Sequence, residues 1–362
     1  MRRILLMDSG SYFVPIGGSI NATTQLYTYL KNIRGYHVDV LGDFSKINAN
    51  VKTINRTEAL KMDYDLMIAN SIRDVLIIDA YMKKHAHSKV IYVDRANILV
   101  NQRKAGLKIL LPKMIARRDL LNRMKKWLAA YIAITPEQKE HAKSFFRKGT
   151  GVYYIPIAPN KEFRRLPVRK ANHIALYVGR LDERQKRLSF LIIAVSKYVH
   201  DNAIRDSETV LKIVGSGPDE HKYRKLARAL GVERNIEFRG LLTGEALVKE
   251  YNGSGFCVST SAWESPGRSF LEAMACGLPL LVNDRNNVIL FSESRTHVVT
   301  DGKNGLVYRY GDIRDFLKKF NLLYRDCKER ARMSEEAYRF SKRFTLDKIN
   351  SEYASVVKKL LG

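Results

Sequence analysis

The sequence has few cysteines and no long apolar run, and each shortage excludes a class of protein. Its three cysteines, Cys257, Cys276 and Cys327, show no paired spacing and no companion histidines, so neither a disulfide framework nor a zinc site is indicated. No run approaches the roughly 18 apolar residues of a membrane-spanning helix. The apolar stretch before Asp8 is too short for a secretory signal peptide. We therefore expect a protein of a reducing compartment that is soluble or peripheral to a membrane.

Acidic residues are also scarce, and their scarcity is uneven. The chain has 37 aspartates and glutamates against 63 lysines and arginines, which gives a formal net charge of +26. Residues 1–170 contain 31 basic and 13 acidic side chains, whereas residues 171–362 contain 32 and 24. Such a field attracts nucleic acid, anionic lipid headgroups or phosphorylated small molecules. The first half of the chain is expected to meet the anionic partner.

The hydrophobic pattern predicts two α/β domains. With 362 residues, 45% of them hydrophobic, the chain is long enough for about two ordinary cores. Buried-strand patterns alternate with helical ones in two series, which predicts parallel sheets covered by helices on both faces. The expected strands are at residues 4–7, 36–41, 66–69, 90–93 and 132–134, and then at 174–178, 210–214, 236–238, 256–259 and 280–282.

Helix signals and a loss of periodicity complete this outline. Thr135-Pro136-Glu137-Gln138 reads as a capping box with proline at the first helical position. Residues 154–172 lose the pattern and read as a linker. We place an N-terminal domain at 1–168, a C-terminal domain at 169–345, and a helix at 346–362 that packs back toward the N-terminal domain. Further helices are expected at 19–32, 75–84, 188–200, 220–230, 245–251 and 269–276, and the pattern is helical from 312 onward.

Two glutamates mark the sharpest candidate site, within residues 263–279 (WESPGRSFLEAMACGLP). Glu264 and Glu272 flank a glycine-containing turn, and Gly277 with Pro279 ends the helix that follows. A helix that begins near Ser269 would direct the free backbone N–H groups of residues 268–271 at a diphosphate. The alternative is that Ser269-x-x-Glu272 is only a capping box.

A pair of cations and a glycine loop lie upstream. Arg180 and Lys186 are six residues apart across the turn that follows the strand at 174–178. A planar guanidinium and a mobile ammonium suit a diphosphate, although a basic run more often faces solvent. Gly215 and Gly217 follow the next strand, where two glycines by themselves indicate a tight turn.

Taken together, these segments resemble the retaining family 4 glycosyltransferases of the GT-B fold. Their signature is a glutamate, seven residues, and a second glutamate that opens Glu-Ala-Met-Ala-Cys-Gly-x-Pro, as Glu272 does here. Residues 35–38 and 301–306 match as well, so the resemblance covers nearly the whole chain. The sequence departs from the pattern at Ser265-Pro266, where Gly-Phe is common, and at Arg268, where an apolar residue is common. The resemblance implies two facing Rossmann-like, doubly wound domains with an interdomain cleft.

The resemblance also implies roles for individual residues. Glu264 would lie by the donor sugar, Glu272 would hold the ribose hydroxyls, and Arg180 with Lys186 would clamp the diphosphate. Asp94 stands where many members have a histidine, so the expected catalytic set is Arg180, Lys186, Glu264 and Asp94; the alternative for Asp94 is a loop anchor with Arg95. The expected nucleotide-sugar contacts are Gly17, Gly18, Gly179, Arg180, Lys186, Gly215, Gly217, Arg239, Leu241, Glu264, Gly267, Arg268, Ser269, Phe270 and Glu272.

No metal or other cofactor is expected, and the nucleotide sugar is a co-substrate. Asp63-Tyr64-Asp65 has the Asp-x-Asp spacing of metal-dependent glycosyltransferases, but Asp65 directly precedes an apolar strand pattern. Two aspartates alone do not fill the coordination shell of Mg²⁺.

A basic amphipathic segment suggests contact with a membrane. Residues 101–130 contain nine basic side chains and one acid, Asp119, interleaved with aliphatic residues. This pattern is typical of interfacial helices on anionic lipid, while the alternative is a surface helix that buries its apolar stripe in the core. The residues expected to bind the membrane are Lys108, Lys113, Arg117, Arg118, Arg123, Lys125 and Lys126.

The sequence thus predicts a retaining, metal-independent hexosyltransferase. It would move a sugar from a UDP- or GDP-linked donor to a hydroxyl of a lipid-linked glycan or glycolipid. Its place would be peripheral, on the cytoplasmic face of the cell membrane, in polysaccharide or glycolipid biosynthesis. One alternative is a nucleotide-sugar 2-epimerase of the same architecture. Another is a non-enzymatic protein that binds anions or nucleic acid, but the segment at 101–128 is aliphatic where nucleic-acid binding favours aromatic residues.

Overall fold

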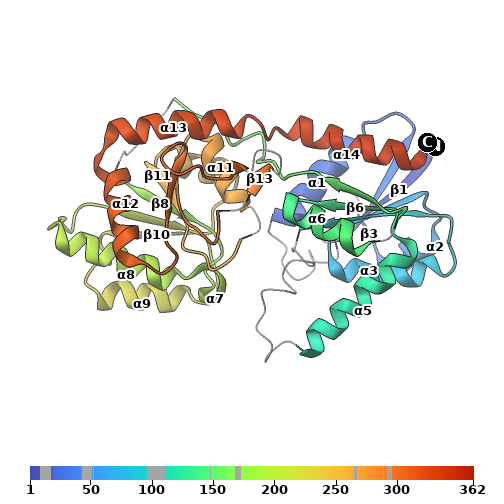
Figure 1. Cartoon of the computed structure of the whole chain (residues 1–362), viewed down its shortest axis with the longest axis horizontal. Helices are drawn as coiled ribbons and strands as arrows, with labels where there is room; N and C mark the ends of the chain where they lie inside the picture. Colours follow the sequence, from blue (N-terminus) through green and yellow to red (C-terminus); the bar gives the residue numbers. More distant parts are fainter. Residues whose placement is uncertain are drawn as a thin grey trace. The chain divides into compact units, whose positions relative to one another are not determined.

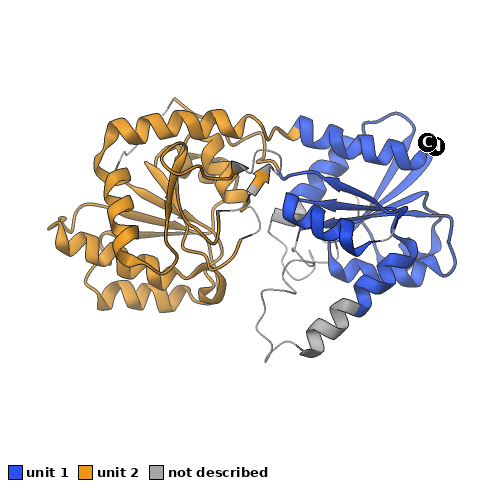
Figure 2. Ribbon diagram, in the orientation of Figure 1, with its two compact units in different colours: residues 1–157, 347–362 blue, residues 158–346 orange. Residues whose placement is uncertain are grey.

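The chain folds into two compact units. The computed structural model describes residues 1–8, 18–42, 51, 53–95, 111–146, 148–167, 173–264, 267–287, 289–291 and 296–362. Unit 1 comprises Met1–Ile157 and Asp347–Gly362, and unit 2 comprises Ala158–Leu346 (Figure 2).

The expected domain boundary at 168/169 lies outside the described residues. The division by contacts falls earlier, at Ala158, because the segment that follows is bound to unit 2. Arg165 pairs with Glu335 at 2.6 Å, and the N–H of Leu166 donates to the side chain of Asn252 at 2.8 Å. The last helix belongs mainly to unit 1, where Arg2 donates to the carbonyl of Leu361 at 3.0 Å.

Unit 1 is built on a parallel sheet in the order β3-β2-β1-β4-β5-β6-β7, with helices on both faces (Figure 1). The strands are β1 (Arg2–Met7), β2 (Tyr36–Leu41), β3 (Thr53–Ile54), β4 (Leu66–Ala69), β5 (Lys89–Asp94), β6 (Ala130–Ala133) and β7 (Gly151–Tyr154). The helices are α1 (Gly18–Leu30), α2 (Arg56–Lys61), α3 (Ile72–Met82), α5 (Leu111–Trp127), α6 (Pro136–Phe145) and α14 (Leu346–Leu361).

Local signals account for these elements. β4 and β6 are buried along their whole length, as expected of central parallel strands that read as continuous apolar runs. The capping box at α6 is confirmed: the side chain of Thr135 accepts from the N–H of Gln138, and that of Gln138 accepts from the N–H of Thr135. The sequence did not predict β3 or β7, which are short and lie at the two edges of the sheet.

Unit 2 repeats the plan with the parallel order β10-β9-β8-β11-β12-β15. Its strands are β8 (Ala175–Val178), β9 (Leu211–Val214), β10 (Ile236–Gly240), β11 (Phe256–Val258), β12 (Leu280–Asn283) and β15 (Gly305–Tyr308), and β13 (Ile289–Phe291) pairs antiparallel with β14 (Thr296–His297). Its helices are α7 (Glu183–Lys186), α8 (Leu188–Asp201), α9 (Glu220–Ala229), α10 (Gly244–Asn252), α11 (Arg268–Ala275), α12 (Ile313–Arg325) and α13 (Cys327–Ser341).

Both sheets are doubly wound, because the strand order reverses direction within each. The reversal falls between β1 and β4 in unit 1 and between β8 and β11 in unit 2. In open parallel sheets, ligands bind beyond the carboxyl ends of the strands at such a reversal point. In unit 2, a ligand site is therefore expected at the residues that follow β8 and β11.

Candidate functional site

The loops that follow β8 and β11 are bonded to each other. The N–H of Ala262 donates to the carbonyl of Gln185 at 2.7 Å, and the hydroxyl of Thr260 donates to the carbonyl of Lys186 at 2.9 Å. These bonds bring the turn that carries Arg180 and Lys186 against the segment that carries Glu264. Arg180, Lys186 and Glu264 thus lie on adjoining loops at the carboxyl edge of the unit 2 sheet, although 78 positions separate Lys186 from Glu264.

Lys186 and Glu264 form an ion pair at this edge. The ammonium of Lys186 contacts Oε1 of Glu264, and the two side chains are only 15% and 11% exposed. Ser261 donates its hydroxyl to the same carboxylate oxygen at 2.9 Å. Arg180 is exposed, and within the described ranges its guanidinium has no ion-pair partner. The edge therefore combines an accessible cation with a paired cation and carboxylate.

The glycines after β9 allow two backbone segments to touch. A Cβ on Gly215 would lie 1.9 Å from the carbonyl oxygen of Gly179, and one on Gly217 would lie 2.3 Å from that of Leu181. Gly215 also has φ +142°, which L side chains rarely adopt. These glycines are needed for packing, and they place their loop beside the turn that carries Arg180.

Helix α11 begins at Arg268 with Gly267 as its N-cap. The expected start near Ser269 is close, but the capping-box alternative is wrong because Ser269 is already the second residue of the helix. No side chain among the described residues caps this end. The positive end of the helix dipole at this N-terminus suits an anion. The side chain of Phe270 is buried, and its backbone N–H donates to the carbonyl of Gly267 at 2.9 Å, so its contact with a donor stays a prediction.

Glu272 is a buried carboxyl on α11. Burial raises its pKa from 4.5 to about 7, although the nearby Arg268 and a hydrogen bond from Tyr251 oppose this shift. The hydroxyl of Tyr251, on α10, donates to Oε2 of Glu272 at 3.1 Å. The motif pattern did not identify Tyr251, because a residue on another helix leaves no signal in the spacing around Glu272.

Two other predicted donor contacts are engaged within unit 2. Arg268 donates to the carbonyl of Ala158 at 3.2 Å and to the side chain of Asn160 at 3.1 Å. Arg239 pairs with Glu250 at 2.8 Å. Leu241 is half exposed at 51%. Their contact with a donor stays a prediction.

In unit 1, the predicted residues are only partly described. Gly17 lies outside the described residues, and Gly18 is the first residue of α1. Asp94 ends β5 and is fully buried, where the hydroxyl of Tyr131 donates to its carboxylate. Its backbone carbonyl accepts from the side chain of Gln138 at 3.2 Å. This environment agrees with a loop anchor, and a role for Asp94 at the donor stays a prediction.

The second half of α5 packs onto unit 1. Leu121 and Met124 are fully buried in its core. Arg123 pairs with Asp119 at 2.9 Å, and Lys125 lies over the ring of Phe145 at 3.8 Å. In this half the apolar stripe faces the protein. Lys108 lies outside the described residues, as do the side chains of Lys113, Arg117 and Arg118, while Lys126 is exposed.

The described residues offer neither a metal cluster nor a membrane-spanning helix. Within the described ranges, no group of three or more His, Cys, Asp or Glu side chains could hold a metal ion. Asp65 pairs with Arg2 at 2.9 Å and accepts from the N–H of Arg3 at 2.7 Å, as the strand-edge interpretation requires. None of the described helices combines the length and apolarity needed to cross a bilayer.

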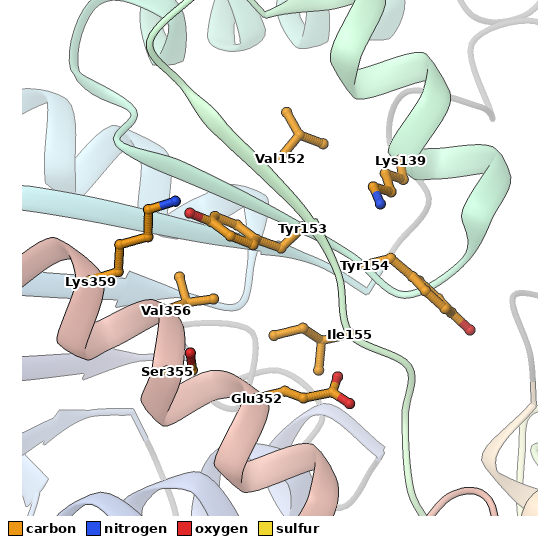
Figure 3. A pocket seen from close by; sticks show the side chains of 9 residues that line it. All are labelled: Lys139, Val152, Tyr153, Tyr154, Ile155, Glu352, Ser355, Val356 and Lys359. Atoms are coloured by element: carbon orange, nitrogen blue, oxygen red, sulfur yellow. The ribbon is translucent and has the colours of Figure 1, made fainter.

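A pocket in unit 1 was not anticipated from the sequence. It has a volume of about 320 Å³ and lies between β7, α6 and α14 (Figure 3). Tyrosine rings and aliphatic groups form its walls, and two lysines, a serine and a glutamate supply polar groups. Its lining is Lys139, Val152, Tyr153, Tyr154, Ile155, Glu352, Ser355, Val356 and Lys359. No local sequence pattern predicts it, because the residues that α14 contributes are about 200 positions away in the chain from those of α6 and β7.

Comparison with known proteins identifies the family. The model of the family "Glycosyl transferases group 1" matches residues 160–340, half of the chain. The chain belongs to this family. Unit 2 of this glycosyltransferase, with its Lys186–Glu264 pair, lies almost wholly within the matched residues.

Relatives and solved structures agree with this assignment. The lipopolysaccharide 1,6-galactosyltransferase of Salmonella typhimurium is 28% identical over 196 residues, 53% of this chain and 51% of that protein. The putative glycosyltransferase EpsD of Bacillus subtilis is 24% identical over 257 residues, 64% and 63% of the two chains. The match thus spans about half to two thirds of these relatives.

The fold is confirmed by superposition. HepE from Anabaena, solved in complex with UDP-glucose, superposes with a TM-score of 0.77 at 18% identity, over 99% of this chain and 100% of that chain. Sucrose-phosphate synthase from Thermosynechococcus elongatus gives a TM-score of 0.77 at 17% identity, over 99% of both chains. The glycosyltransferase therefore has the GT-B fold that its sequence predicted.

Proposed function

We propose that this glycosyltransferase transfers a hexose from a nucleotide-diphosphate sugar, UDP- or GDP-linked, to an acceptor hydroxyl with retention of anomeric configuration. The proposal rests on the arrangement of charged residues at the carboxyl edge of the unit 2 sheet. There, the exposed Arg180 and the Lys186–Glu264 pair lie on adjoining loops. Cations suit the diphosphate, and carboxylates suit sugar hydroxyls, which donate to them.

The chemistry follows from the charge that develops on the leaving diphosphate. As the bond between the anomeric carbon and the diphosphate breaks, negative charge grows on the phosphate oxygens. Arg180, Lys186 and the N-terminal end of α11 would stabilise that charge without a metal. In a same-face displacement, the acceptor oxygen bonds to the anomeric carbon while a leaving phosphate oxygen takes the acceptor proton. No side-chain base is required in this scheme.

The buried Glu272 would hold the nucleotide. An ionised carboxylate accepts hydrogen bonds from two vicinal hydroxyls, as a ribose presents them. HepE, described in complex with UDP-glucose, supports a uridine nucleotide for a protein of this fold. The galactosyltransferase of Salmonella supports a hexose as the transferred group.

We further propose that the acceptor is a lipid-linked glycan or glycolipid that contacts unit 1. The pocket between β7 and α14 supports this, because saccharides pack on tyrosine rings and hydrogen-bond to lysine and serine (Figure 3). The basic excess of residues 1–170 supports peripheral binding to the anionic cytoplasmic face of a membrane. Residues 101–118 together with Lys126 would provide that contact.

The test is nucleotide release from UDP-, GDP-, ADP- and dTDP-sugars in the absence of acceptor. We expect slow hydrolysis of one donor by the wild type, lost in Arg180→Ala and in Glu272→Ala. Arg184→Ala is the matched control, because Arg184 lies on the same turn but is 89% exposed and faces Asp182 at 3.7 Å. Release that is equal in all four proteins, or absent with every donor, would overturn the proposal. A modified free sugar as product would favour a 2-epimerase.

A further inference from the structure

Arg187 holds a backbone conformation that glycine would adopt more easily. It joins α7 to α8 with φ 50° and ψ 44°, in the left-handed region. Arg187 and Ala203 are the non-glycine residues with positive φ in the part of the chain that is described. This conformation costs a residue with a Cβ about 1 kcal/mol relative to glycine.

The backbone bonds of this turn do not need the arginine side chain. The carbonyl of Arg187 accepts from the hydroxyl of Thr260 at 3.2 Å and from the N–H of Phe190 at 3.1 Å. A glycine would preserve both bonds and remove the strain. A reason for arginine must therefore come from what its guanidinium contacts.

That guanidinium shares an aromatic ring with a second one. Arg187 lies over the ring of Tyr310 at 4.7 Å from its centroid, and Arg285 lies over the same ring at 4.1 Å. Arg285 follows β12 and Tyr310 follows β15, so both belong to the carboxyl edge of the unit 2 sheet. Lys186, the neighbour of Arg187, pairs with Glu264.

Neither guanidinium is neutralised by an acid in the described ranges, although other cations of this unit are. Arg184 faces Asp182 at 3.7 Å, and Arg309 faces Asp312 at 3.5 Å. Asp284, the neighbour of Arg285, accepts from the backbone N–H of Tyr310 at 3.0 Å. Two permanent positive charges on one ring repel each other, and a bound anion would relieve that repulsion.

We propose that Arg187 and Arg285, supported by Tyr310, bind an anionic group, a carboxylate or phosphate, on the sugar substrate. The inference rests on the proposed function, which places Glu264 at the donor sugar; Arg187 is the chain neighbour of Lys186, which pairs with Glu264. A guanidinium presents two parallel N–H donors that match the two oxygens of such a group. A neutral sugar leaves these donors to water. The pair thus selects acidic sugars over neutral ones.

Calorimetric titration of the full chain tests the donor as the source of the anion. The probes are UDP-glucuronate against UDP-glucose and GDP-mannuronate against GDP-mannose. We expect wild type to bind one acidic donor about tenfold more tightly than its neutral counterpart, a difference typical of one charge-assisted contact. Arg187→Gly and Arg285→Ala should each abolish the difference, and Arg184→Ala should keep it. Arg187→Gly removes a strained residue, so we expect its Tm to be at least that of the wild type.

A second arm tests the acceptor as the source. If acidic and neutral donors bind alike, methyl glucuronide and glycerol 3-phosphate are titrated with UDP present. Binding of either that weakens about tenfold in Arg187→Gly and Arg285→Ala, but not in Arg184→Ala, assigns the anion to the acceptor. Affinities of all these anions that are unchanged in both variants would overturn the inference.

Failure of this inference is distinguishable from failure of the proposed function. Normal binding of neutral nucleotide sugars without any dependence on Arg187 and Arg285 would overturn only the anion site. If wild type binds no nucleotide sugar, the proposed donor falls. In that case methyl glucuronide and glycerol 3-phosphate, titrated without UDP, still decide whether the two arginines bind an anion.

Discussion

The ammonium of Lys186 and the carboxylate of Glu264 pair across two loops that the sequence separates by 78 positions. Lys186, which the sequence suggested for phosphate binding, and Glu264, which it suggested for sugar binding, thus neutralise each other in this structure. With both side chains largely buried, the pair holds the turn after β8 against the segment after β11. A donor diphosphate would compete with Glu264 for Lys186, which would leave that carboxylate free for a sugar hydroxyl.

Removal of either partner of this pair should reduce stability more than removal of both. Lys186→Met leaves the carboxylate of Glu264 uncompensated, and Glu264→Gln does the same to the ammonium, each at a cost of about 1–3 kcal/mol in the free energy of unfolding. The double variant should recover part of that loss. Urea unfolding of the four proteins measures this. Strictly additive losses would show that the two charges do not interact.

The buried Glu272 should make stability fall as pH rises. Its pKa of about 7 lies above the 4.5 of an exposed glutamate, so the folded state holds a proton that the unfolded chain releases between these values. Below pH 4.5 both states are protonated and there is no penalty; above pH 7 the penalty is complete, on the order of 3 kcal/mol. Glu272→Gln should therefore stabilise the protein at pH 8 relative to wild type and have little effect at pH 4. Urea unfolding at the two pH values tests this, and equal effects would contradict it.

The same carboxyl should make nucleotide binding depend on pH. If its ionised form accepts from the ribose, affinity for the donor should rise as pH increases through about 7 in the wild type. Glu272→Gln should bind weakly at every pH. A wild-type affinity that stays constant from pH 5.5 to 8.5 would contradict the role proposed for Glu272.

Gly215 should not tolerate a side chain. Gly215→Ala would place a Cβ 1.9 Å from the carbonyl oxygen of Gly179, at φ +142°, so we expect a loss of about 3 kcal/mol or more in stability. Gly231→Ala is the matched control: it also has positive φ, +69°, but no atom lies within 4 Å of the added Cβ. It should cost about 1 kcal/mol. Thermal unfolding measures the stability of both variants. Equal losses of stability would show that the cost comes from backbone strain and not from the close contact with Gly179.

The basic residues of the first half of α5 should control membrane binding. We expect the Lys113, Arg117 and Arg118 triple alanine variant to float less with vesicles of anionic phospholipid than wild type, because each charge near the surface contributes about 1 kcal/mol. Lys222, Lys225 and Arg228, exposed on α9, provide an equal loss of charge in unit 2 as the control. Equal flotation of the triple variant and wild type would remove the membrane contact from the proposal.

Tyr153 should affect use of the acceptor but not of the donor. Tyr153→Ala removes a wall of the unit 1 pocket (Figure 3), where Lys359 lies 5.7 Å from the centre of the ring. We expect a several-fold rise in KM for the acceptor with unchanged nucleotide release in its absence. Tyr153→Phe should retain most of the activity. A change confined to donor hydrolysis would contradict this role.

The sequence by itself determined the local structure and the chemical class of the protein. Strand and helix periods predicted both doubly wound units, and Thr135 with Gln138 predicted the start of α6, because these signals depend on neighbouring residues. The motif around Glu264 and Glu272 pointed to the family. The spacing of Arg180 and Lys186 placed two cations on one turn.

Only the tertiary structure decided how these groups meet. The pairing of Lys186 with Glu264, the burial that raises the pKa of Glu272, and the contact of Arg187 and Arg285 with Tyr310 join residues distant in the chain. Such contacts form when parallel strands bring their carboxyl ends to one edge, and no local pattern encodes them. The hydrogen bond from Tyr131 to Asp94 and the packing of the second half of α5 onto unit 1 also join residues distant in the chain, so only the tertiary structure revealed them.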